Sequence, residues 1–318
     1  MPTKTMTVQE LFDEFIEAKT YEIRKVSVSK IIRFFKNHIL TNFSNYRIDK
    51  ITVRDVQNWK ISIERKNLSL STKKTAFIYF NAMINYAIKM EYLQKNPLEK
   101  IGNFKNTLGF KREMNFYTPQ EFKEFITSAK ETATEKENLN NDLSEWNYYV
   151  FFNIAFYTGL RKGEIHALKW SDIEGEYLSV SRSLYQKLKD GDIETPPKNP
   201  TSCRTLQMPI PLITILDEHK KLQERLHNFT DDFRICNNVR DTSLQRKKKL
   251  YSEQANVKTI RIHDFRHSHA SVLANNNINI QEVARRLGHS RIEITLNRYC
   301  HLYPKEEEKA VSVLNSLT

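Results

Sequence analysis

The chain has 318 residues, with 50 Lys and Arg against 38 Asp and Glu, so its formal net charge is +12. Hydrophobic residues make up 39% and aromatic residues 11%, enough to bury real cores, which excludes wholesale disorder and suggests two domains or three. No apolar run reaches the roughly 18 residues of a membrane span, no signal-peptide pattern opens the chain, and three scattered cysteines cannot form a disulfide framework. These properties favour a cytoplasmic protein with a polyanionic partner, nucleic acid before anionic membrane.

The positive charge is unevenly distributed along the chain. Residues 1–112 hold 21 Lys and Arg against 10 Asp and Glu, whereas residues 113–318 hold 29 against 28. Such asymmetry indicates two parts with different tasks. A lysine-rich, solvated surface without a partner is the simpler alternative, and charge alone does not exclude it.

Residues 1–99 are predicted to form a small helical domain of four short helices. Four stretches carry helix-start residues or apolar residues at helical spacing: Thr7 to Ile16, Ile31 to Ile39, Thr52 to Ile63, and Ser69 or Ser71 to Asn96-Pro97. Residues 100–116 lack periodicity and carry two glycines, so they are predicted to be a linker.

Residues 117–318 are predicted to form a second domain, mainly helical with a small antiparallel sheet. The helical stretches are 118 onward, 146–157, 161–168, 211–227, and 263 onward with breaks near 275–277 and 288. Strands are predicted at 177–181 and 204–208, on either side of a polar turn region at 189–202. Residues 231–260 are polar and receive no assignment.

Three segments of this second part concentrate reactive residue types. They are Thr158-Gly-Leu-Arg161-Lys-Gly-Glu164, His263-Asp-Phe-Arg266-His267, and Leu287-Gly-His289 followed ten residues later by Tyr299. Lys198 lies between the first two, at the tip of the expected hairpin.

This set of residues suits phosphoryl transfer without a metal ion. Arginine binds two phosphate oxygens at once through its planar fork, so two arginines and histidine donors can stabilise a pentavalent phosphorane. Nearby positive charge favours the phenolate of a tyrosine, and a lysine can protonate the leaving sugar oxygen. The resulting phosphotyrosine keeps the phosphodiester energy, so rejoining needs no ATP and no cofactor.

At these motifs the sequence resembles the tyrosine recombinases, also called phage-type integrases. TGLRKGEI (158–165), HDFRH (263–267) and LGHSRIEITLNRYCH (287–301) occur in the family's order and with normal spacings. The resemblance covers roughly residues 115–318 and implies a tyrosine-recombinase catalytic domain. It extends more loosely to a SAM-like core-binding helical domain at about 5–100.

The resemblance implies how the scissile phosphate is bound. Arg161 and Arg266 would hold it. His263 and His289 would donate hydrogen bonds to its oxygens and assist proton movement.

The resemblance also implies the reacting groups. Tyr299 would attack and hold the DNA 3′ end, Lys198 would be the general acid for the 5′ oxygen, and Glu164 would support the site. Lys198 departs from the usual Lys-Thr-Lys pattern of the family, and Lys187 and Lys189 compete for its role.

Other residues invite functional interpretations that the pattern does not favour. Tyr303 is a rival nucleophile, but it lacks the right distance from His289. Tyr157 is predicted to pack in the core, and His267 and His269 to be structural. The three cysteines lack zinc-finger spacing, so no structural zinc is expected.

DNA contacts are expected mainly in the first domain. Cations that would touch phosphates are Arg24, Lys25, Lys30, Arg33, Lys73 and Lys74, and the run Arg246, Lys247, Lys248 and Lys249 is expected to be a solvated loop near DNA. Residues 304–318 form a short amphipathic helix that would dock on a neighbouring protomer or on its own domain.

The resemblance implies a site-specific recombinase that integrates and excises a phage or another mobile element. Four protomers would join two double-stranded DNA attachment sites through a Holliday junction, with accessory directionality or DNA-bending proteins as further partners. A housekeeping recombinase that resolves chromosome dimers and a recombinase-like DNA-binding protein that no longer cuts are the alternatives.

Overall fold

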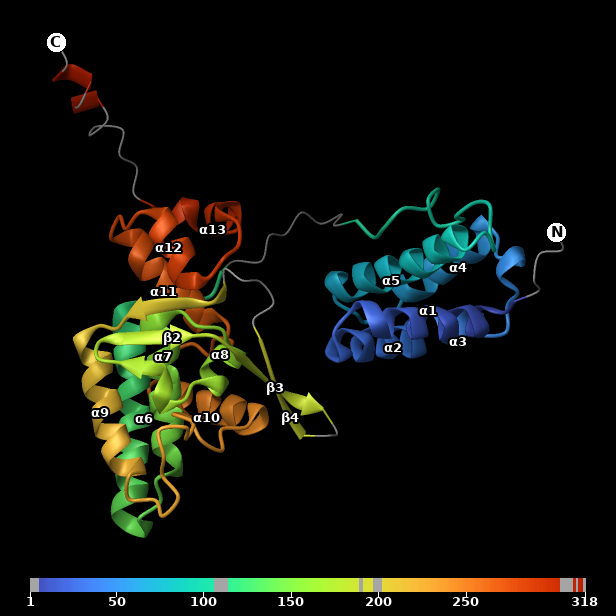
Figure 1. Ribbon diagram of the computed structural model, residues 1–318. Coiled ribbons are helices and arrows are strands. Elements are labelled where there is room, and N and C mark those ends of the chain that lie inside the picture. Colours follow the sequence, from blue (N-terminus) through green and yellow to red (C-terminus); the bar gives the residue numbers. More distant parts are fainter. Residues whose placement is uncertain are drawn as a thin grey trace. The chain divides into compact units, whose positions relative to one another are not determined.

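The computed structural model describes residues 6–105, 114–188, 191–196, 202–303, 311–312 and 314–316. The chain separates into two compact units, Met1–Arg112 and Glu113–Thr318, hereafter the N-terminal unit and the C-terminal unit (Figure 1). The fold is mainly helical with small antiparallel sheets, which confirms the predicted fold class. Within the ranges described, no helix combines the length and apolar character needed to span a bilayer.

The N-terminal unit is a bundle of helices around one aromatic core. Its elements are α1 (Val8–Glu22), α2 (Lys25–His38), α3 (Leu40–Phe43), η1 (Ile48–Lys50), α4 (Val53–Glu64) and α5 (Leu70–Lys89). Thr7 and Thr52 each form a capping box, which satisfies free backbone N–H groups at the start of α1 and α4. In the core, the Trp59 ring packs edge-on against Phe80, and its indole N–H donates to the carbonyl of His38.

Two boundaries in the N-terminal unit differ from the prediction. Helix α5 begins after Ser69 but ends at Lys89 rather than at Asn96-Pro97, and Glu91 then adopts a left-handed φ of 61°. Phe104 lies in the predicted linker, yet it is 4% exposed and packs in the core of this unit. The folded part therefore extends beyond the predicted end at residue 99.

The C-terminal unit is built around one buried helix. Its helical elements are α6 (Pro119–Asn140), α7 (Ser144–Thr158), α8 (Lys162–Ala167), η2 (Trp170–Asp172), α9 (Ile210–Gln223), α10 (Asp241–Gln254), α11 (Asp264–Asn275), α12 (Ile280–Leu287), α13 (Ile292–Tyr299) and η4 (Cys300–Leu302). Helix α7 is apolar on all its faces, because α6, α9 and α11 pack around it. Helices α11 to α13 follow the predicted breaks closely.

Two small antiparallel sheets complete the C-terminal unit. Strands β1 (Ile173–Glu174), β2 (Tyr177–Val180) and β5 (Arg204–Gln207) form one sheet in the order β1-β2-β5. The predicted pairing of β2 with β5 is confirmed, with Tyr177 opposite Gln207. The expectation of a single hairpin formed by β2 and β5 is wrong, because β3 (Ser183–Leu188) and β4 (Gly191–Thr195), which lie between them in the sequence, form a hairpin of their own. Lys198 and Lys189 themselves lie outside the described residues.

The basic run at 246–249 lies in helix α10, so its prediction as a solvated loop is wrong. Lys247 forms an ion pair with Glu145, which is 1% exposed, and Lys248 is 7% exposed. Tyr251, one turn beyond Lys247, is buried and also binds Glu145. The run is helical because one of its faces packs on the core. Lys247 and Lys248 are therefore not a free DNA-facing surface, while Arg246 is exposed.

Candidate active site

Arg161 follows a turn that only glycine fits well. Helix α7 ends at Gly159, whose φ is +65°, a backbone conformation that side-chain-bearing residues rarely adopt. A Cβ at this position would lie 2.7 Å from the ring of His269 and 2.9 Å from Leu287. The turn packs α7 against α11 and α12, and it places Arg161 at the N-cap of α8.

The Arg161 guanidinium lies between a carboxylate and a helix end. Its Nη1 donates to Glu164 Oε1 at 2.9 Å, and its Nη2 donates to the Gly288 carbonyl at 3.1 Å. Glu164 Oε2 also accepts from the Arg161 backbone N–H at 2.9 Å. These contacts fix the direction of the guanidinium relative to α12, the helix that ends at Gly288.

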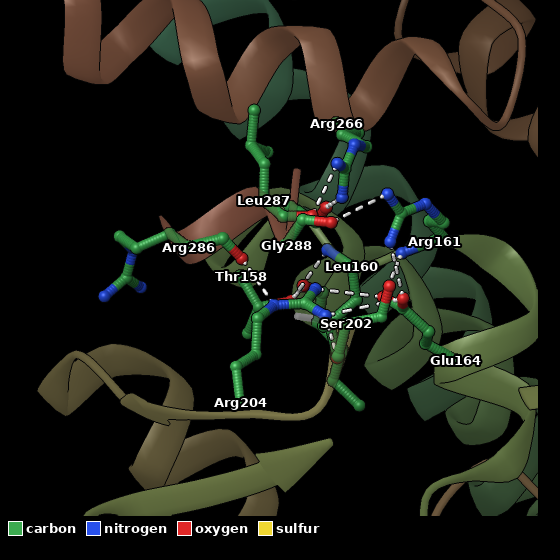
Figure 2. A network of polar contacts seen from close by, with 12 residues as sticks. Thr158, Leu160, Arg161, Glu164, Ser202, Arg204, Arg266, Arg286, Leu287 and Gly288 are labelled. Atoms are coloured by element: carbon green, nitrogen blue, oxygen red, sulfur yellow. Dashed lines mark hydrogen bonds and ion pairs between the residues drawn. The ribbon is translucent and has the colours of Figure 1, made fainter. Parts of the chain in front are cut away.

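Arg266 is held beside Arg161 by neighbouring carbonyls. Its Nη1 donates to the Gly159 carbonyl at 2.8 Å, and its Nη2 donates to the Leu287 carbonyl at 2.6 Å. Figure 2 shows both guanidinium groups pointing toward the same Leu287–Gly288 segment. Helix C-termini carry partial negative charge, so the ends of α7 and α12 offset the repulsion between the two arginines.

The environment of Arg266 is strongly electropositive. The side chain is 2% exposed, and burial together with the charge of Arg161 lowers the pKa of Arg266 to about 9. The contacts in the described part of the chain use two of the five N–H donors of this guanidinium. A site of this kind attracts an anion that can accept the remaining donors.

Glu164 is buried between two arginines, and sequence reasoning found only one of them. Arg204, the first residue of β5, donates from Nη2 to Glu164 Oε2 at 2.9 Å and from Nε to the Arg286 carbonyl at 2.7 Å (Figure 2). Burial alone would raise the pKa of Glu164, but the charges of Arg204 and Arg161 lower it. The sequence signal for Arg204 is its position at the start of the predicted strand.

Two histidines lie near Arg161 and Arg266. His289 directly follows Gly288, and its Nδ1 lies 2.7 Å from Thr295 Oγ1. Burial, and then the charges of Arg266 and Arg161, lower the pKa of His289 to about 3. At the start of α11, partial desolvation and the charge of Arg266 also lower the pKa of His263. Both rings are therefore held neutral in the absence of an anion.

Tyr299 ends helix α13 in a buried position. The residue is 1% exposed, and burial raises the pKa of its hydroxyl to about 12, although Arg266 and Arg298 act in the opposite direction. The hydroxyl lies 2.6 Å from Nδ1 of His267, a residue that sequence reasoning treated as structural. His263 completes this group, since its ring centroid lies 5.1 Å from that of His267.

The other candidates lie elsewhere. Tyr303 donates its hydroxyl hydrogen to the carbonyl of Ile278 at 2.8 Å, and Tyr157 packs against aromatic residues of the core. His269 contacts the Phe156 carbonyl through Nδ1. In the part of the chain that the structure describes, no three His, Cys, Asp or Glu side chains gather as they would around a metal ion.

The predicted DNA-contacting cations of the N-terminal unit fall into two groups. On α2, Arg24 precedes the first residue, and it is exposed together with Lys25, Lys30 and Arg33. On α5, Lys73 and Lys74 are partly buried. Lys73 donates to the Glu64 carbonyl at 3.0 Å.

Comparisons with known proteins define the class. The profile described as "Phage integrase family" matches residues 116–306, and "Phage integrase, N-terminal SAM-like domain" matches residues 7–61. The chain therefore belongs to the phage integrase family. It is a tyrosine recombinase, a site-specific enzyme that cleaves and rejoins DNA.

Several relatives are similar to this protein over most of the chain. The ICEBs1 integrase of Bacillus subtilis is 28% identical over 88% of this chain and 75% of its own length. A XerC-like tyrosine recombinase of Caldanaerobacter subterraneus is 29% identical over 89% of this chain and 76% of its own. The integrase of Staphylococcus phage L54a is 22% identical over 99% and 94%.

Solved structures share the fold. The Tn1549 transposon integrase in complex with a circular intermediate DNA superimposes with a TM-score of 0.74 at 20% identity, over 99% of this chain and 100% of that one. A lambda integrase dimer bound to a COC′ core site gives 0.66 at 16% identity, over 91% and 97%.

Proposed function

We propose that this recombinase holds a scissile DNA phosphate between Arg161 and Arg266. The observation that carries the proposal is that both guanidinium groups bind the carbonyls of Leu287 and Gly288, two adjacent residues. Two planar forks beside each other can bind several oxygens of one phosphate. Because the pair is already in place, it stabilises the charge that develops on the oxygens during transfer.

The proposed nucleophile is Tyr299, which would form a 3′-phosphotyrosine. His263 and His289 flank the arginine pair and donate hydrogen bonds to the phosphate oxygens. Lys198 is proposed as the general acid that protonates the leaving 5′ oxygen. Glu164 orients Arg161 rather than reacting.

The energy of the broken phosphodiester is kept in the phosphotyrosine ester. A free 5′ hydroxyl can therefore attack it and release Tyr299 without ATP. The arginines neutralise the phosphate charge, so the proposed reaction needs no cofactor.

The proposed role is the integration and excision of a phage or another mobile element. The names of two relatives, the ICEBs1 integrase and the integrase of phage L54a, support this role. A chromosome-dimer-resolving recombinase is the alternative, favoured by the XerC-like relative. A protein that binds DNA without cutting is disfavoured, because Arg161, Arg266 and Tyr299 are all present.

The proposed assembly is a homotetramer on two double-stranded attachment sites, in the cytoplasm of the host cell. One relative, lambda integrase, has been solved as a tetramer bound to a Holliday junction, which supports strand exchange through such a junction. Accessory directionality or DNA-bending proteins complete the proposed set of partners.

Residues 304–318 are proposed to join neighbouring protomers, although the structure describes only 311–312 and 314–316 of this segment. Deletion of 305–318 is expected to weaken tetramer assembly on DNA, measured by light scattering. Unchanged assembly contradicts this role.

A suicide substrate tests the proposed chemistry. In such a substrate a nick lets the short fragment that carries the free 5′ hydroxyl diffuse away after cleavage, so that the covalent protein–DNA adduct accumulates. We expect an adduct with the wild-type protein and none with Tyr299→Phe, while DNA binding by the two proteins is equal. No adduct with the wild-type protein, or an adduct that survives Tyr299→Phe, refutes the proposed function.

A further inference from the structure

The hydroxyl of Tyr299 has one hydrogen-bond partner among the described residues, and that partner is His267. Tyr299 Oη lies 2.6 Å from His267 Nδ1, and the two residues are 1% and 3% exposed. Neither Arg161, Arg266, His263 nor His289 makes a hydrogen bond to this hydroxyl in the described structure. The contact joins α13 to α11 across 32 residues of sequence.

The direction of this hydrogen bond follows from the protonation states. Burial raises the pKa of Tyr299 to about 12, so the phenol keeps its proton near neutral pH. Burial is the main cause that lowers the pKa of His267 to about 4, so the imidazole is neutral. The phenol is therefore the donor, and Nδ1 accepts through its lone pair, which leaves the ring proton on Nε2.

We propose that His267 is a catalytic residue that accepts the proton of Tyr299 as this tyrosine attacks the phosphate. The proposal rests on the proposed function, in which Tyr299 is the nucleophile. His267 is the residue whose nitrogen touches the reacting oxygen, and a general base must lie within hydrogen-bond reach of the proton that it removes.

Tyr299 Oη forms a bond to phosphorus, the bond from phosphorus to the 5′ oxygen breaks, and the Oη proton moves to Nδ1 of His267. The leaving 5′ oxygen takes a proton from a separate acid, which we place at Lys198. In rejoining, the 5′ hydroxyl returns its proton to that acid as it attacks phosphorus, and the departing phenolate takes its own proton back from the His267 imidazolium.

Proton transfer accompanies attack rather than preceding it. A phenol with a pKa near 12 does not transfer its proton to an imidazole with a pKa near 4 in the resting enzyme. As the bond from Oη to phosphorus forms, the Oη proton becomes much more acidic and can pass to the imidazole. The phosphate brings negative charge into a site crowded with arginines. That charge favours the imidazolium and so assists the transfer.

The experiment measures single-turnover formation of the covalent adduct on the suicide substrate, at protein concentrations that saturate the DNA. His267→Ala removes the acceptor. His267→Asn keeps an oxygen acceptor close to the position of Nδ1 but cannot take the proton. Both variants are expected to cleave about 10²- to 10⁴-fold more slowly than the wild type, with unchanged DNA affinity. The control is His219→Gln, which alters a buried histidine of α9 whose Nε2 contacts the Ile235 carbonyl.

A fluorinated tyrosine at position 299 separates proton transfer from packing. Its hydroxyl is more acidic and depends less on a base, so it is expected to recover most of the rate lost in His267→Asn. A second substrate carries sulfur in place of the 5′ oxygen, and this leaving group needs no proton. It is expected to rescue Lys198→Ala but not His267→Asn.

The possible results separate the inference from the function on which it rests. If the wild type gives no Tyr299-dependent adduct, the proposed function fails. If the wild type gives one and His267→Asn cleaves at a similar rate or faster, the function stands and the inference is overturned. The inference is also overturned if the fluorinated tyrosine leaves the slow rate of His267→Asn unchanged, since a structural defect would not respond to hydroxyl acidity.

Discussion

The two units of this recombinase use positive charge in opposite ways. Residues 1–112 carry 21 cationic against 10 anionic residues, and the cations of α2 are exposed. Residues 113–318 carry 29 against 28, yet Arg266 and Lys248 are 2% and 7% exposed. Among the described residues, the unit with the larger net charge exposes the cations of α2, while the nearly neutral unit buries Arg266 and Lys248.

This difference separates affinity from chemistry. Exposed cations attract the DNA backbone in proportion to their number, and salt screens that attraction. A buried arginine is held in one direction by its partners and acts on one phosphate in a shielded site. Substitutions in the N-terminal unit should therefore change binding, whereas substitutions around Arg266 should change cleavage.

The largest expected effect is the loss of an arginine that is proposed to bind the scissile phosphate. Arg266→Ala removes the guanidinium that α11 contributes to the site. We expect adduct formation to slow by about 10³-fold or more, because the charge that develops on the phosphate loses a preorganised partner. The affinity for DNA should stay within a few-fold of the wild-type value, since that affinity comes mainly from other phosphate contacts.

Its control is Arg225→Ala, which removes an exposed arginine that pairs with Glu137 on the same unit. Slow cleavage in both variants, or an equal loss of affinity and rate in Arg266→Ala, contradicts the proposal that Arg266 serves cleavage rather than DNA binding.

The next effect concerns stability. Glu164→Gln leaves Arg204, whose side chain is 4% exposed, without its charged partner. Breaking a buried ion pair is costly, so the free energy of unfolding should fall by about 3 kcal/mol in urea denaturation. Glu253→Gln, which disrupts an exposed pair with Lys249, should change it by no more than about 0.5 kcal/mol. Equal effects would show that the buried network is not what holds this site together.

Much of the site could be predicted from sequence because its motifs lie at element boundaries. Arg161 follows the Gly159 turn, and His289 follows Gly288, the residue that ends α12. Glycine and spacing signal such boundaries in any chain. The β2–β5 pair and the helices other than α3 and α10 were predicted for a related reason, since their apolar periodicity is local.

What could not be predicted depends on partners far away in sequence. Lys247 of α10 pairs with Glu145, which lies 102 residues earlier, and Arg204 of β5 pairs with Glu164, which lies 40 residues earlier. His267 resembles any core histidine until Tyr299 is placed beside its ring. A charged or polar residue acquires its role here from a contact that no local pattern encodes.

The third prediction tests the N-terminal unit. The triple variant Lys25→Gln, Lys30→Gln and Arg33→Gln removes exposed charge from α2. If these residues contact phosphates, the slope of the logarithm of DNA affinity against the logarithm of salt concentration should become shallower by about 3, as each lost contact contributes about 0.9. The cleavage rate at saturation should not change.

The matched control removes the same charge from exposed lysines of the C-terminal unit: Lys123→Gln, Lys130→Gln and Lys221→Gln. A control slope that falls as much as that of the α2 variant would place the DNA affinity in both units.

A smaller effect is expected on the free energy of unfolding as the pH falls. His219 is buried, and burial lowers its pKa to about 4. The unfolded chain binds a proton near the ordinary histidine pKa of about 6.5, so the stability from the neutral ring is present above that pH and is lost as the pH falls toward 4. Between pH 7 and 5.5 His219→Gln should lose about 1 kcal/mol less stability than the wild type. Equal losses would show that His219 does not contribute to the acid sensitivity.

The smallest expected effect falls on the one basic run in the nearly neutral unit. Lys247→Gln should leave the salt slope unchanged, because its ammonium already neutralises buried Glu145. It should also cost little stability, since Glu145 keeps Lys136 at 3.1 Å and the Tyr251 hydroxyl at 2.5 Å.

Arg246→Gln is the internal control. Arg246 is the exposed neighbour, and its loss should lower the slope by about 1 if it contacts a phosphate. A slope that falls for Lys247→Gln and not for Arg246→Gln would mean that this helix releases its buried charge to DNA. The two units would then no longer differ in how they use their cations.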